Sequence, residues 1–117
     1  GQTRAAASVE LVESQMAAYN AKDLEAYLAP YAREVELRLL SSGEVLARGT
    51  DFMRGAYGAR FEQAADLQAT VREQVALGDL VANLERITDA RDEWSESIDI
   101  YLVGPGGIRL VWIVIPR

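Results

Sequence analysis

The sequence contains no cysteine and no histidine among its 117 residues. Without cysteine the chain can form no disulfide and offers no thiolate nucleophile, and without either residue it lacks the usual ligands of a zinc site. The absence of histidine also excludes a serine–histidine–aspartate triad. We expect no metal and no cofactor, so any catalysis must use carboxylates, tyrosines, arginines or backbone amides.

Positive charge and long hydrophobic runs are also scarce. One lysine, Lys22, and eleven arginines stand against 18 acidic residues, which gives a formal charge of −6 at pH 7. A protein that binds nucleic acid or anionic lipid needs a basic surface to neutralise phosphates. The longest apolar run, Leu110–Ile115, has six residues, far fewer than the roughly 20 that cross a bilayer. The sequence therefore predicts neither nucleic acid nor a membrane as partner.

The overall composition is that of one globular domain, with half of the residues apolar and about a quarter charged. A chain of this length buries roughly two-thirds of its unfolded surface, enough for a core and one modest pocket. We expect a single domain over residues 1–117, with 1–7 as a flexible N-terminal segment. The sequence starts at Gly1 and its first methionine is Met16, so a tag remnant or a removed signal peptide is expected, and both cytoplasmic and exported locations stay open.

Hydrophobic periodicity separates a helical first part from a strand-rich remainder. Apolar residues at steps of three and four predict a helix over about 5–20, a short helix between Asp23 and Pro30, and a third helix that begins at Thr50. Alternating patterns predict strands. The expected strands cover residues 34–39, 45–48, 67–77, 80–88, 94–103 and 108–115.

Three helices and a long antiparallel meander predict an α+β domain whose helices cover one face of a curved sheet. The other face is not polar, because the last strand is apolar on both sides and its neighbour carries Ile98, Ile100 and Leu102 on one side. Such a face is normally covered. We expect a homodimer that packs sheet against sheet through the convex face, and coverage by the N-terminal segment is the alternative.

Several short motifs occur in an informative order. They are Asn20-Ala21-Lys22-Asp23-Leu24 between the first two helices, Gly49-Thr50 at the start of the third, Arg54 and Tyr57 on it, and Ile108 with Trp112 in the last strand. From about Val9 to Ile115 the chain thus resembles the nuclear transport factor 2-like superfamily, and more narrowly its SnoaL-like and ketosteroid-isomerase-like branch. The resemblance implies a cone-shaped, cystatin-like fold with a curved antiparallel sheet wrapped around three helices, a mostly apolar pocket and frequent dimerisation.

The same resemblance allows a comparison of catalytic positions. Ketosteroid isomerases move a proton with an aspartate base, while a tyrosine and a protonated aspartate donate hydrogen bonds to the developing oxyanion. The resemblance places Leu39 at the position of the base and Gln15 at that of the oxyanion tyrosine. It places Asp99 at the position of the protonated aspartate and Tyr57 at that of a supporting tyrosine. Because leucine cannot accept a proton, an isomerase mechanism requires another carboxylate.

Two other charged residues are candidates for the cavity. Glu73 interrupts an otherwise apolar strand face and is the better substitute base, since Glu34 and Glu36 are expected to face away. A solvated strand end or an ion pair with an arginine is the alternative for Glu73. Arg86 lies on an apolar strand face and is able to enter the cavity. A pair between Arg86 and Asp99 or Glu73 would prevent that acid from donating a proton.

The expected ligand contacts come from the helices and the penultimate strand. Asp99 and Tyr101 share a strand face, and burial in a dry pocket would raise the pKa of Asp99 and make it a hydrogen-bond donor. An ion pair with Arg86 or Arg109 is the alternative. Gln15 offers an amide or lies at the surface, and tyrosines on apolar helix faces are core residues or polar anchors. The candidate ligand-binding residues are Gln15, Tyr19, Tyr57, Asp99 and Tyr101.

Three functions fit these features. The first is a small-molecule-binding SnoaL-like domain, whose apolar pocket carries a few polar anchors and takes a small apolar or aromatic molecule. The second is a cofactor-free isomerase or aldol-type cyclase that acts on a cyclic carbonyl compound, with Asp99 as acid and an unassigned base. The third is a dimeric protein-interaction module. A deep cavity favours the first two, and a second carboxylate near its centre favours catalysis.

Overall fold

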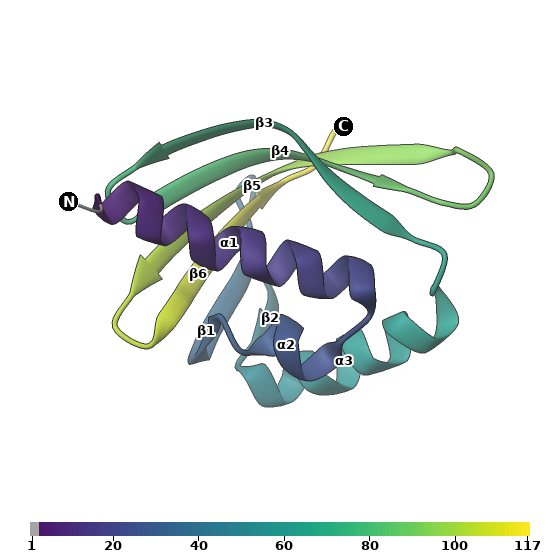
Figure 1. Cartoon of the computed structure of the whole chain (residues 1–117), viewed down its shortest axis with the longest axis horizontal. Helices are drawn as coiled ribbons and strands as arrows, with labels where there is room; N and C mark the ends of the chain where they lie inside the picture. Colours follow the sequence, from purple (N-terminus) through teal and green to yellow (C-terminus); the bar gives the residue numbers. More distant parts are fainter. Residues whose placement is uncertain (1–2) are drawn as a thin grey trace.

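A computed structural model describes residues 3–117, and Figure 1 shows a curved sheet that arches over three helices. The predicted α+β class is confirmed. Residues 1 and 2 of the expected flexible segment lie outside the described residues, and the first helix already includes Arg4–Ala7. In chain order the elements are α1 (Arg4–Ala21), α2 (Leu24–Leu28), β1 (Tyr31–Leu39), β2 (Val45–Arg48), α3 (Thr50–Gln63), β3 (Gln68–Leu77), β4 (Leu80–Thr88), β5 (Trp94–Gly104) and β6 (Gly107–Val114).

Local capping residues set the limits of the first two helices. The Thr3 side chain accepts a hydrogen bond from the Ala6 amide, and Lys22 ends α1 in a left-handed conformation with φ of 57°. Asp23 then caps α2 by accepting from the backbone N–H of Ala26. None of the described helices is long and apolar enough to cross a membrane.

The six strands form one sheet in the order β2-β1-β6-β5-β4-β3. Strands β3 to β6 pair in sequence as the predicted antiparallel meander. The sheet is not wholly antiparallel, however, because β1 lies parallel to β6. Parallel neighbours require a long connection, and the intervening chain from β2 to β5 provides it. This pairing brings the first strand of the chain next to the last.

The core lies between the concave face of the sheet and the helices (Figure 1). Helix α1 packs against β3 and β4, whereas α3 packs against β1 and β2. The fully buried apolar side chains come from all of these layers: Val12, Val35, Met53, Val81, Ile108 and Val111. The concave face is not completely filled by side chains, and the candidate site lies in the remaining space beside all three helices.

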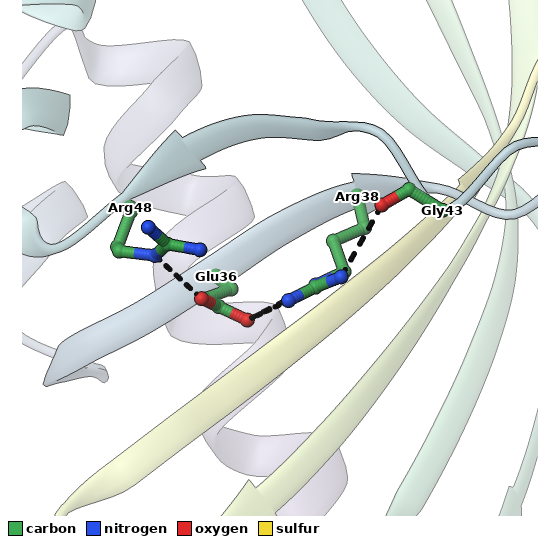
Figure 2. A network of polar contacts seen from close by, with 4 residues as sticks. All are labelled: Glu36, Arg38, Gly43 and Arg48. Carbon is green, nitrogen blue, oxygen red and sulfur yellow. Dashed lines mark hydrogen bonds and ion pairs between the residues drawn. The ribbon is translucent and has the colours of Figure 1, made fainter.

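The convex face combines an apolar area with an ionic edge. Ile98, Ile100 and Leu102 of β5 lie opposite three apolar residues of β6, and none of them faces the helices. At the β1–β2 edge, Figure 2 shows Glu36 between Arg38 and Arg48, with N···O distances of 2.8 and 2.6 Å. Glu36 therefore faces away from the cavity, as the strand parity predicts.

Candidate functional site

A cavity of about 380 Å³ lies between the concave face of the sheet and the helices. Its walls come from α1, α2, α3 and the strands, so no single segment of the sequence forms it. The structure brings all five predicted ligand-binding residues to this cavity: Gln15, Tyr19, Tyr57, Asp99 and Tyr101. Their role in binding stays a prediction, but their convergence provides several polar groups on a largely apolar wall.

Glu85 is the important residue that the sequence interpretation missed. Its side chain is buried and lines the cavity from β4. The Tyr101 hydroxyl donates a short hydrogen bond to Glu85 Oε2, and Asn83 Nδ2 donates to the same oxygen at 3.2 Å. Gln74 Nε2 in turn donates to Asn83 Oδ1 at 2.9 Å. A polar chain across β3, β4 and β5 thus fixes a second carboxyl group at the cavity.

Glu85 was missed because both faces of β4 contain apolar residues. The face with Leu84 and Arg86 is the more hydrophobic in sequence, but it is the convex one, whereas Glu85 shares the concave face with Val81. The available signal was the pair Asn83 and Glu85 at alternate positions. Two polar residues on a strand face that also has apolar residues indicate either a solvent-exposed face or a buried polar site.

Burial changes the acidity of the two carboxyl groups. Burial, and after it the charge of the neighbouring Asp99 carboxylate, together raise the pKa of Glu85 to about 7, against the hydrogen bonds from Tyr101 and Asn83. Burial also raises the pKa of Asp99, although Ser97 Oγ donates a hydrogen bond to Asp99 Oδ1 at 2.6 Å. Near neutral pH the pair therefore retains a proton, and the cavity contains both a carboxylic acid donor and a carboxylate acceptor.

Gln15 links this acid pair to the buried tyrosines. Its Nε2 donates to the Tyr101 hydroxyl at 3.3 Å, and its Oε1 accepts from the Tyr31 hydroxyl at 3.1 Å. Burial raises the pKa values of Tyr27, Tyr31, Tyr57 and Tyr101, so their phenols stay protonated at neutral pH. The described side chains include no buried polar atom without a hydrogen-bond partner. The polar wall is thus preorganised.

Glu73 and Arg86 do not enter the cavity, which corrects two expectations. A bulge between Val71 and Glu73 places two residues of β3 opposite one of β4, so the strand changes its inward-facing parity and Glu73 becomes exposed on the convex face. Arg86 lies on the same face, pairs with Glu96 at 3.1 Å and stacks over the Trp94 ring at 3.8 Å. It therefore leaves Asp99 free to act as a donor.

Two further expectations concern the ion pairing of Asp99 and the position of Leu39. Asp99 forms no ion pair within the described part of the chain, so neither Arg86 nor Arg109 neutralises it. Leu39, which the resemblance places at the position of the base, does not line the cavity, whereas Leu37 does. Neither leucine supplies a proton acceptor. Residues 3–117 contain no group of three potential metal-ligating side chains.

A comparison of the chain with models of protein families identifies the family to which it belongs. The model of the SnoaL-like domain matches residues 12–111, which is most of the chain. The chain belongs to the SnoaL-like domain family. The match spans α1 to β6 and therefore includes both carboxyl groups and the tyrosine cluster. The resemblance seen in the sequence motifs is thus confirmed at the level of the family, and the cystatin-like, nuclear transport factor 2-like fold is confirmed with it.

Solved structures similar to this SnoaL-like domain share its fold. An uncharacterised cystatin-fold protein from Novosphingobium aromaticivorans is 20% identical, with a TM-score of 0.83, and the alignment covers 97% of this chain and 99% of that protein. A candidate ketosteroid isomerase from Kribbella flavida is 23% identical, with a TM-score of 0.80 and coverage of 100% and 83%. A SnoaL-like protein of unknown function from Burkholderia thailandensis is 19% identical, with a TM-score of 0.74 and 94% of each chain covered. A comparison with curated protein sequences finds no significant match.

Proposed function

We propose that this SnoaL-like domain binds a small, largely apolar molecule that carries a carbonyl or phenolic oxygen. The observation that carries the proposal is the buried Glu85 beside the half-buried Asp99, at a cavity whose lining also includes aromatic and aliphatic side chains. Ligand sites are commonly apolar clefts with a few convergent polar groups, and the volume of about 380 Å³ lies within their usual range. The protonated carboxyl would donate to the ligand oxygen, and the aromatic wall would contact its apolar body.

The pattern of hydrogen bonds explains how the site would select its ligand. Tyr101, Gln15 and Tyr31 hold one another and the Glu85 carboxylate, so they need no water or ligand to satisfy them. Asp99 has only Ser97 as a described hydrogen-bond partner and is half-buried, so its carboxyl group is the more available of the two for a ligand. A ligand with no polar group to hydrogen-bond this carboxyl would leave it unsatisfied in the complex, which costs roughly 1–3 kcal/mol.

A thermal-shift screen of steroids, flavonoid-like phenols and short fatty acids tests the proposal. A compound that binds only the folded chain must raise the melting temperature. For the compound with the largest shift, Asp99→Asn should weaken binding about tenfold, because the amide keeps the shape but replaces the acid donor. Asp79→Asn, in the exposed turn between β3 and β4, should bind like the wild type. Equal affinities of the Asp99→Asn and wild-type chains would contradict the assigned role of Asp99.

A second carboxyl group at the cavity also favours the enzymatic alternative. In that alternative Glu85 accepts a proton from carbon next to a carbonyl, and Asp99 donates a hydrogen bond to the resulting enolate oxygen. A pKa of about 7 gives Glu85 both protonation states near neutral pH. The domain would then be a cofactor-free isomerase or an aldol-type cyclase for a cyclic carbonyl compound. Deuterium exchange at that carbon in D₂O distinguishes catalysis from binding alone.

The convex face supports a separate proposal about assembly. Ile100 and Trp112 lie side by side at the centre of an apolar area formed by β5 and β6, and Ile98 is 43% exposed. We infer that two chains pack through this face as a homodimer. Light scattering at micromolar concentration should give twice the chain mass, and Trp112→Glu should give a monomer because it buries an unpaired charge. Phe52→Glu, on α3, is the matched control and should remain dimeric.

A monomeric mass for the wild-type chain would exclude the homodimer. It would also exclude the dimeric protein-interaction module, which depends on the same surface.

A further inference from the structure

Arg60 is the one cationic residue in the wall of the inner cavity, as far as the described residues show. It lies on α3, and none of the ion pairs within residues 3–117 includes it. The neighbouring arginine on the same helix, Arg54, is by contrast paired with Glu25. A guanidinium has five N–H donors in a planar fork that fits a carboxylate. Arg60 therefore has donors available for a ligand.

The position of Arg60 is fixed by Tyr19. Its Nε donates to the Tyr19 hydroxyl at 3.2 Å, and its guanidinium carbon lies 5.9 Å from the centre of the same ring. Lys22 lies over that ring as well, at 4.5 Å, and its ammonium donates to the backbone carbonyls of Leu67 and Tyr19. The proximity of Arg60 contributes to lowering the pKa of Lys22, after burial. Two cations thus gather at this end of an otherwise acidic chain.

A second, more open hollow of about 690 Å³ begins at the same residue. This outer groove lies between α3 and the strands β1 and β2, and its lining is mainly apolar, with contributions from Leu46, Ala47, Phe52, Ala56 and Leu67. Leu37, Tyr57, Arg60 and Ile113 belong to both walls, so the inner cavity and the outer groove adjoin there. Phe52 is 57% exposed in the groove, an apolar surface without a described cover.

We propose that the outer groove binds an amphiphilic carboxylic acid, with its carboxylate on Arg60, where the groove adjoins the inner cavity, and its apolar tail along the groove. This inference rests on the proposed small-molecule function and names the ligand class. The acid pair inside the cavity and the net charge of −6 repel anions elsewhere, so the carboxylate is directed to Arg60. The apolar tail of the ligand covers the side chains of Phe52 and Leu46, and it thereby buries the exposed apolar surface of the outer groove.

Calorimetric titration of the full chain with decanoate and with its neutral counterpart decanol tests the inference. We expect the wild type to bind decanoate at least about tenfold more tightly than decanol, because only decanoate can form a charge-assisted hydrogen bond with the Arg60 guanidinium. Arg60→Gln should remove this preference, and Arg60→Lys should retain part of it. Arg54→Gln, the control on the exposed face of α3, should retain all of it. Phe52→Ser should weaken decanoate and decanol equally, because the tail contacts do not depend on the head group.

The outcomes separate this inference from the proposed function. If decanoate and decanol bind equally well to the wild type, or if Arg60→Gln keeps the preference for decanoate, the carboxylate site is wrong while small-molecule binding stands. If neither probe binds but a steroid or phenol raises the melting temperature, the inference is likewise wrong and the proposed function stands. If neither these probes nor any compound of the thermal-shift panel binds, both fail.

Discussion

Between pH 5 and pH 8, the free energy of unfolding of the wild-type chain should fall by about 3 kcal/mol relative to that of the Glu85→Gln variant. The cause is the buried Glu85 carboxyl, whose pKa is raised from 4.5 to about 7 in the folded chain. The Glu85→Gln variant should still fold, because an amide oxygen at this position can accept the same hydrogen bonds from Tyr101 and Asn83.

The sign of this effect follows from proton binding. Between the unfolded pKa of 4.5 and the folded pKa of about 7, the folded chain holds the Glu85 proton and the unfolded chain has released it. The folded state therefore loses stability as the pH rises through this window, and the loss is complete above the folded pKa. Burial raises the pKa of Asp99 in the same direction. The comparison with Glu85→Gln isolates the contribution of Glu85 from those of the other carboxyl groups.

Urea unfolding at pH 5, 6, 7 and 8 measures the difference between the two chains. Glu36→Gln is a control whose stability should run nearly parallel to that of the wild type over this pH range, because the hydrogen bonds from Arg38 and Arg48 lower the pKa of Glu36 from 4.5. Wild-type stability conferred by Glu36 is present above its unfolded pKa and is lost as the pH falls through its folded pKa. Parallel pH profiles of the wild-type and Glu85→Gln chains would show that Glu85 ionises equally in both states, which contradicts its buried environment.

Gly107→Ala should destabilise the fold by about 3 kcal/mol or more. Gly107 starts β6 with φ of 122°, a conformation that residues with a side chain rarely adopt. A Cβ atom built there would lie 2.3 Å from the carbonyl oxygen of Pro30, which accepts a hydrogen bond from the Ile108 amide at 2.8 Å. The variant would therefore push β6 away from β1 where the parallel pair begins, and urea unfolding would show the loss.

Gly43→Ala is the matched control for this backbone effect. Gly43 also has a positive φ, 76°, but no atom lies within 4 Å of the position that a Cβ atom would take there. The left-handed conformation alone costs about 1 kcal/mol for alanine. We therefore expect a small loss of stability at Gly43 and a large one at Gly107. Equal losses would mean that the close approach to Pro30 does not limit the side chain at Gly107.

The two acid residues connect stability with function. A buried carboxyl group with a raised pKa reduces stability at neutral and alkaline pH, so glutamine at position 85 should give a more stable chain at pH 8. Under the proposed function, the same substitution removes an acceptor or donor from the ligand cavity. Perturbed carboxyl groups of this kind are common at functional sites because an acid or base is useful when its pKa lies near the working pH.

The candidate site was only partly predictable from the sequence. Asp99 and Tyr101 were found because they share one face of β5 and because the family resemblance marks Asp99, and both line the cavity. Glu73 was a wrong expectation because a bulge shifts the parity of β3, and such an irregularity leaves little trace in an alternating pattern. Arg86 was wrong because the more apolar face of β4 is the convex one.

The sequence by itself determined the α+β class, most of the helices and strands, the family and the lack of thiol and imidazole chemistry. Those features depend on composition and on local periodicity, and both can be read directly from the sequence. The tertiary structure alone decided that Glu85 joins Asp99, that Arg60 borders both hollows, and that β1 lies parallel to β6. When both faces of a sheet are apolar, local pattern does not reveal which face is concave, and only the packing of helices α1 and α3 on the strands selects it.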